Sequence, residues 1–169
     1  MISLKKLSLA VLFASLSLTI RTANLLVIPL PIPPLKLDFR GVLAYIGSML
    51  VGPEYAWIIG VGAGKLFMGT DWVGWIPAMT ACALTFKKLK RKLEVKIAVS
   101  VAIGMLIGYS CYLPVYTIVY GVPPQGISFL LALLAFRATL NYAATIPLSI
   151  VFFKALKRYS PQEYSFYTS

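Results

Sequence analysis

The sequence of 169 residues contains no histidine, two cysteines and five acidic residues. Histidine is the commonest general base and a frequent metal ligand, so its absence removes the usual candidate for both roles. Cys82 and Cys111 lie in apolar stretches without CxxC spacing, which is typical of small buried hydrophobic side chains. With few carboxylates and no visible pairing of a nucleophile with a base, candidates for catalysis are almost absent. We therefore predict that the protein is not an enzyme and carries no metal and no cofactor.

A nucleotide-binding loop is missing as well. The stretch GVGAGK, residues 60–65, has glycines and a lysine, but the spacing is not that of a phosphate-binding loop. It also lies within an apolar segment instead of following a soluble strand. We do not expect this chain to bind ATP.

The composition indicates an integral membrane protein. Hydrophobic residues make up 59% of the chain and charged residues 12%, whereas soluble domains are typically about 45–50% apolar and about 25% charged. The net charge is +11, and a basic balance can indicate nucleic-acid binding. Here the lysines flank apolar segments, so membrane topology explains them better and no nucleic-acid partner is predicted.

Residues 28–53 combine a proline cluster, a short charged patch and an apolar run. The cluster comprises Pro29, Pro31, Pro33 and Pro34. Each proline fixes its φ, lacks an N–H and disfavours the α region for the residue before it. The sequence therefore predicts a structured, non-helical loop, which must lie in water or line a protein cavity. The pair Gly52-Pro53 then separates two apolar runs.

Six apolar segments can be placed, at residues 7–28, 40–51, 54–68, 72–86, 95–119 and 127–156. The second and third are short for a span of about 20 residues and need tilt or burial inside the bundle. The charged start and apolar run at the N-terminus resemble a signal peptide, but no clear cleavage site follows, so we interpret the segment as a first transmembrane helix. The predicted fold class is an all-α membrane protein. Residues 1–158 form one six-helix transmembrane bundle, and residues 159–169 form a polar tail that should fray.

The basic residues set the predicted orientation. With the N-terminus inside and six alternating helices, eleven of the sixteen basic residues lie inside and two, Lys36 and Arg40, lie outside. The other three, Arg21, Lys65 and Arg137, fall within spans. This bias matches the positive-inside rule. We predict a multi-pass protein of the cell membrane with both termini cytoplasmic.

Small residues mark predicted packing faces. Ala10 and Ala14 lie four residues apart on one face of the first helix, where another helix could approach closely. This pair could pack inside the bundle or form a docking surface. The glycines at 60 and 64, and at 104 and 108, predict close helix packing.

Tyrosines and polar residues mark a predicted ligand site in the later helices. Tyr109 and Tyr112 belong to a tyrosine stripe on the fifth segment, where flat rings suit stacking on a planar heterocycle. Tyr116 and Tyr120 continue that stripe and could form an interfacial belt. On the sixth segment, Arg137 has no obvious acidic partner within the membrane, so an anionic ligand, a backbone carbonyl or a partner protein could satisfy it.

The order of these parts resembles the substrate-binding membrane subunit (S component) of energy-coupling-factor (ECF) vitamin transporters. The resemblance covers nearly the whole chain. It rests most on residues 35–53, LKLDFRGVLAYIGSMLVGP, where the family shows an L-x-x-D-F segment followed by a G-P break. The Ala10/Ala14 pair is similar to the first-helix A-x-x-x-A of the family, which implies docking on a transmembrane scaffold subunit.

The resemblance implies a ligand site near the outer face, built by the first loop and the outer ends of the later helices. It implies these ligand-binding residues: Lys36, Asp38, Trp72, Trp75, Tyr109, Tyr112, Gln125, Arg137 and Asn141. Arg21 is left out because it shares the stripe of Ala10 and Ala14. The implied partners are a vitamin-like small molecule, the scaffold subunit and two cytosolic ATPases, which drive uptake. Riboflavin is the first substrate expected, with pantothenate, a thiamine precursor and biotin as other possibilities.

Two other functions were weighed. An independent small transporter or channel would need a coupling-ion site, typically intramembrane carboxylates, and no clear one stands in the spans. A membrane-embedded enzyme lacks candidates for its chemistry, as the missing histidine and scarce acids indicate.

Overall fold

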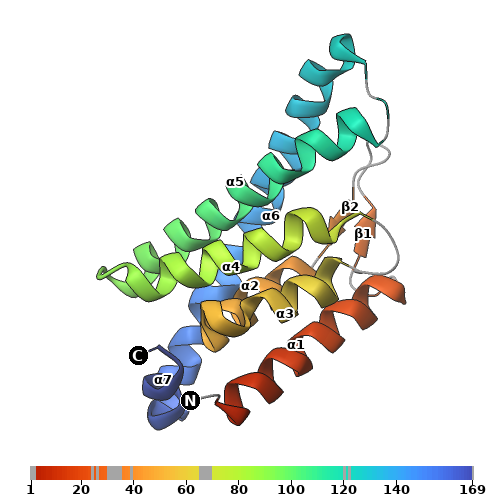
Figure 1. Ribbon diagram of the computed structural model, residues 1–169. Coiled ribbons are helices and arrows are strands. Elements are labelled where there is room, and N and C mark those ends of the chain that lie inside the picture. Colours follow the sequence, from red (N-terminus) through yellow and green to blue (C-terminus); the bar gives the residue numbers. More distant parts are fainter. Residues whose placement is uncertain are drawn as a thin grey trace.

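The computed structural model describes residues 3–23, 25, 27–29, 36–38, 40–64, 70–119, 121 and 123–168. These residues form helices and one short two-stranded ribbon (Figure 1). In chain order the elements are α1 (Leu4–Thr22), β1 (Val27–Pro29), β2 (Lys36–Asp38), α2 (Arg40–Val51), α3 (Pro53–Gly64), α4 (Trp72–Lys88), α5 (Leu93–Ile118), α6 (Pro124–Tyr159) and α7 (Pro161–Thr168).

Each of the six apolar segments contains one helix, and the bounds of α2 agree with the prediction at both ends. The first helix is shorter than expected, because it ends at Thr22 and residues 27–29 form β1 instead. Strand β1 pairs with β2 in antiparallel register, with Ile28 opposite Leu37. Prolines from residue 29 onward explain this, since they disfavour helix for the residues before them. Pro31, Pro33 and Pro34 lie outside the described residues.

The break between α2 and α3 has the predicted local chemistry. Gly52 has φ +82, a conformation that glycine adopts without steric cost. Pro53 is the first residue of α3, where its missing N–H has no helical partner to lose. The two short helices therefore meet in a tight turn.

Glycines bring α3, α4 and α5 into close contact, as the sequence predicted. A Cβ added to Gly60 would lie 2.6 Å from Cα of Ile76 in α4, and one added to Gly64 would contact the backbone of Trp72. A Cβ on Gly104 of α5 would lie 2.8 Å from the carbonyl oxygen of Ala78. Contacts this short leave room for glycine only. Helix α4 therefore packs closely against α3 on one side and α5 on the other.

Ala10 and Ala14 form an internal packing surface in this structure. Ala10 is fully buried, and a Cβ on Gly62 of α3 would strike the backbone of Ala14. The side chain of Ala14 is half-buried, and docking of a scaffold subunit through this pair stays a prediction. The pair packs within the chain, because these small residues let α1 approach α3 closely.

The C-terminal tail is helical and packed, so the prediction of fraying is wrong. Helix α7 begins at Pro161, and proline suits the first position of a helix. Tyr164 and Tyr167 pack against the hydrophobic core. Glu163 forms an ion pair with Lys5, with 2.6 Å between Nζ and Oε1. Aromatic side chains within a polar segment supply the burial that fixes it.

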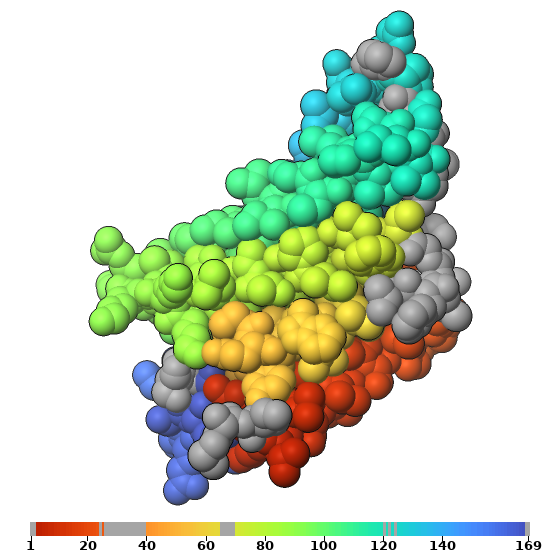
Figure 2. All heavy atoms as spheres, viewed as in Figure 1, coloured from red at the N-terminus to blue at the C-terminus, as the bar shows by residue number. Residues whose placement is uncertain are grey.

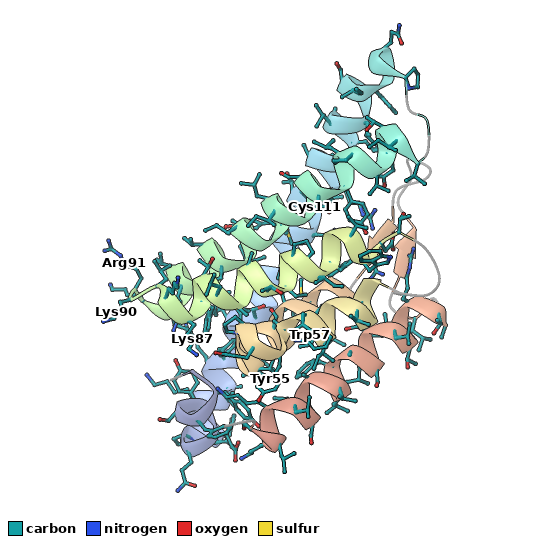
Figure 3. The ribbon with its side chains drawn as sticks, in the orientation of Figure 1. Tyr55, Trp57, Lys87, Lys90, Arg91 and Cys111 are labelled. Carbon is teal, nitrogen blue, oxygen red and sulfur yellow. The ribbon has the colours of Figure 1, made fainter. Side chains whose placement is uncertain are left out.

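The helices run back and forth, so that both ends of the described chain lie at one end of the bundle (Figure 1). Lys87, Lys90 and Arg91 lie around the α4–α5 turn on that same side (Figure 3). Among the described residues, two helical stretches are long and apolar enough to cross a membrane, Leu93–Ile118 and Gln125–Tyr159. The outer parts of α5 and α6 project beyond the other helices (Figure 2).

Candidate ligand-binding site

A cavity of about 210 Å³ is lined by the ends of α1, α2 and α4 that lie away from the two chain ends (Figure 1). Its walls come from the end of α1, the starts of α2 and α4, the second half of α5 and the middle of α6. Its polar and aromatic lining residues are Arg21, Arg40, Tyr45, Asp71, Trp75, Tyr109, Tyr112, Tyr116, Arg137 and Asn141. We call it the cationic cavity, because three arginines line it against one aspartate.

Asp71 holds two of these arginines together. Its Oδ2 lies 3.6 Å from a terminal nitrogen of Arg21 and 3.8 Å from Nη1 of Arg40. The Arg40 side chain is 1% exposed, and Nη1 also donates a hydrogen bond to the carbonyl oxygen of Ala63 at 2.5 Å. Its guanidinium stacks on Trp75, 4.6 Å from the ring centroid. A buried charge needs such partners, and together they fix one wall of the cavity.

Aromatic rings form much of the remaining lining of the cavity. The ring centroids of Tyr112 and Tyr116 are 6.1 Å apart, and the Tyr112 hydroxyl donates a hydrogen bond to the carbonyl oxygen of Asp71 at 2.7 Å. The ring of Tyr112 passes directly over Gly74, where any Cβ would collide with it. Trp75 and Tyr45 form a second aromatic pair, with 6.3 Å between their ring centroids. These faces suit stacking with a flat ligand group.

Helix α6 contributes Arg137 and Asn141, which lie one turn apart on the same face. The Asn141 amide donates a weak hydrogen bond to the Tyr109 hydroxyl at 3.4 Å. Nε of Arg137 is buried and has no hydrogen-bond partner among the described residues. The ion pairs at this end join Asp71 to Arg21 and Arg40, not to Arg137. Arg137 is therefore the cation with most capacity for an incoming anion.

Five of the predicted ligand residues come together in the cavity: Trp75, Tyr109, Tyr112, Arg137 and Asn141. Trp72 does not line it and is 37% exposed, because α4 turns the preceding Asp71 and the following Trp75 inward instead. Gln125 is exposed at the start of α6. Lys36 and Asp38 belong to β2, but their side chains lie outside the described part of the structure.

Sequence reasoning missed Arg21, Arg40 and Asp71. Arg21 was left out because its stripe on α1 was expected to face a partner. That stripe of α1 faces the other helices of the chain, so Arg21 in the last turn of α1 lines the cavity. Arg40 was expected outside the membrane and Asp71 was not singled out, although Arg40 begins an apolar helix, where a charge indicates a buried role. Tyr116, expected in an interfacial belt, also lines the cavity.

Among the described residues, no group of three or more acidic, cysteine or histidine side chains is placed so that it could hold a metal ion. The lining residues instead offer hydrogen-bond donors, positive charge and aromatic faces. Comparison of the chain with protein-family models, with curated proteins and with solved structures found no match.

Proposed function

We propose that this chain is the substrate-binding membrane subunit of an importer of the ECF kind. It captures a small vitamin-like ligand from outside the cell and presents it for ATP-driven uptake. The cationic cavity carries this proposal, because a polar hollow between helices of a hydrophobic bundle is typical of a binding site. The resemblance of residues 35–53 to S components supports it independently.

The proposed topology is six spans with both chain ends in the cytoplasm. The basic residues around the α4–α5 turn and near the chain ends support it through the positive-inside rule. The cavity then opens toward the outside. Helices α2 and α3 have 12 residues each, or about 18 Å, and are shorter than the hydrocarbon core. Most of α2 is buried, so it is covered by its neighbours instead of by lipid.

The lining residues favour a ligand with a flat part and an acid group. Tyr112 and Tyr116 offer stacking faces, which supports riboflavin as the first substrate expected. The excess of arginines over Asp71 adds a preference for negative charge, which riboflavin lacks and which pantothenate and biotin have. A carboxylate at Arg137 would form charge-assisted hydrogen bonds, which are stronger than neutral ones.

The ATPases must come from other chains, because no phosphate-binding loop is present here. Ligand-loaded subunit would associate with a transmembrane scaffold and two cytosolic ATPases, as the resemblance implies. The internal position of Ala10 and Ala14 means that docking through this pair would require α1 to move away from α3. An independent transporter is the alternative. The carboxylate that lines the cavity, Asp71, already lies against two arginines and is poorly placed for a coupling cation.

Purification of the chain alone in detergent, followed by mass spectrometry of what copurifies, tests the proposal. A vitamin or cofactor precursor in near one-to-one ratio is the expected result. Affinity capture from native membranes should also recover a scaffold protein and ATPases. An empty preparation that binds no vitamin of a panel, together with capture of no ATPase, would contradict the proposed function.

A further inference from the structure

The cationic cavity is small for the ligand that it is proposed to bind. Its volume is about 210 Å³, whereas sites for small ligands typically measure about 300–1,000 Å³. A vitamin-sized molecule with its polar group in the cavity therefore needs further space beside it.

A second hollow of about 450 Å³ lies between α5 and α6. One stripe of each helix lines it, with residues at steps of three and four. On α5 they are Ala102, Met105, Leu106, Tyr109, Ser110 and Leu113; on α6 they are Leu131, Leu134, Ala135, Ala138, Thr139 and Tyr142. We call this hollow the apolar groove.

The cavity and the groove adjoin each other. Met105, Tyr109 and Leu134 line both. Each helix thus turns one stripe to the cavity and the neighbouring stripe to the groove, with these three residues at the border. The combined space falls within the range typical of small-ligand sites.

The apolar groove is open on one side, where Leu106 and Leu131 are exposed. Side chains of adjacent helices normally interdigitate, with axes about 8–10 Å apart, and protein interiors hold few voids larger than a water molecule. Here Leu106 is 69% exposed and Leu131 is 45% exposed. The apolar lining favours an apolar chain as occupant. The stripe from Ala102 to Leu113 is about 16 Å long, enough for an alkyl chain of medium length.

Arg137 places positive charge beside this groove. It precedes Ala138 of the groove stripe, and its own side chain lines the cavity. Its buried Nε has no hydrogen-bond partner in the described part of the chain. An acid group bound there would start at the border of the groove, so that an attached tail could enter it.

On the premise of the proposed function, we infer that the ligand is an amphipathic anion. Its acid group binds Arg137 and Asn141 in the cationic cavity, and its unbranched apolar tail lies in the apolar groove between α5 and α6.

Calorimetric titration of the purified chain at constant detergent concentration tests this inference. The probes are butanoate, hexanoate and octanoate, with methyl octanoate as the neutral counterpart and benzoate as an anion without a tail. The variants are Ala138→Phe, which fills the groove, and Ala132→Phe, an exposed position on α6 outside the groove. Ala135→Phe, on the groove stripe at an exposed position, replaces Ala138→Phe if that variant does not fold.

We expect affinity to rise about fourfold per added methylene. This dependence should vanish in Ala138→Phe and persist in Ala132→Phe, and methyl octanoate should bind at least tenfold more weakly than octanoate. Equal binding of the ester and the acid, with no effect of Arg137→Ala, would show a groove for lipid chains and overturn the inference. Tight binding of benzoate without dependence on chain length, unchanged in Ala138→Phe, would also overturn it while leaving the proposed function intact. Failure of every anion to bind would overturn the inference, whereas the proposed function stands or falls separately with the copurified ligand and the captured ATPases.

Discussion

Charged residues at the two ends of the bundle differ in how deeply they are buried. At the end with the chain termini, three ion pairs join Lys5 to Glu163, Lys87 to Glu54 and Lys154 to Glu94. Their side chains are 40–59% exposed. At the other end, Arg40 is 1% exposed and meets Asp71 and the face of Trp75 around a cavity.

The difference in burial indicates two separate roles for charged residues, one in membrane topology and one in ligand binding. Exposed pairs contribute about 0–1 kcal/mol each, so the basic end matters through its total charge beside the membrane. Buried charges are costly unless they are paired, and they are kept where a site needs them. Under the proposed function, the same residue types set orientation at one end and recognition at the other. The predictions below test this contrast, beginning with the largest effect.

Replacement of Arg40 by methionine should lower the free energy of unfolding by about 3 kcal/mol, because Asp71 loses a buried partner and Ala63 loses a donor. Lys87→Met, which breaks an exposed pair, should change it by no more than about 1 kcal/mol. Size-exclusion chromatography after heating, in one detergent, compares the two variants. Equal losses of stability would remove the contrast between the ends.

Arg137→Ala should weaken binding of an anionic ligand by about 1.5–3 kcal/mol, or roughly 10- to 150-fold in Kd. The reason is the loss of charge-assisted hydrogen bonds in the cavity. Arg158→Ala, at the basic end, is the control and should leave Kd unchanged. Titration with the copurified ligand, or with octanoate, measures both. An unchanged affinity in Arg137→Ala would remove this residue from the site.

Asp71→Asn should act in the opposite direction. Asparagine keeps the shape but removes the negative charge beside the cavity, so affinity for an anion should rise by roughly threefold to tenfold. High salt should reduce this gain, since screening weakens interactions of partly exposed charges. Glu54→Gln, an equivalent change at the basic end, should have no effect on binding. A lower affinity in Asp71→Asn would mean that positioning of Arg21 and Arg40 matters more than net charge.

The helices were predictable from sequence, but the cavity was only partly so. Helix α2 was found at both bounds because a charged patch precedes it and Gly52-Pro53 follows it. Tyr109, Tyr112 and Arg137 were found because they are polar or aromatic within apolar segments. Arg40 and Asp71 lie far apart in the chain, and no periodicity links them. Only tertiary packing joins them, so no sequence pattern indicated that they share a site.

The sequence also did not predict which helix the small-residue face of α1 contacts. An A-x-x-x-A face allows close approach of any helix, whether from the same chain or from a partner. The partner here is α3, whose Gly62 meets Ala14. Arg21, on the same face, consequently enters the cavity. Small-residue spacing predicts that a contact exists, and the identity of the contacting helix depends on the whole bundle.

The smallest predicted effect concerns Glu163→Gln. This carboxylate forms a hydrogen bond that raises the pKa of Lys5 above its usual value. A raised pKa in the folded state means that the pair stabilises α7 below the pKa of the unfolded lysine and loses this effect as pH rises through the folded value. The variant should therefore increase hydrogen exchange in α7 slightly at neutral pH and match the wild type at strongly alkaline pH.

Glu94→Gln, which breaks the pair with Lys154, is the control and should leave exchange in α7 unaltered. Ligand binding should be unchanged in both variants, because the cavity lies at the other end of the bundle. A loss of binding in Glu163→Gln would show that the two ends are coupled. In that case the surface pairs would contribute to the site through the helices that connect them, and the separation of topology from binding would fail.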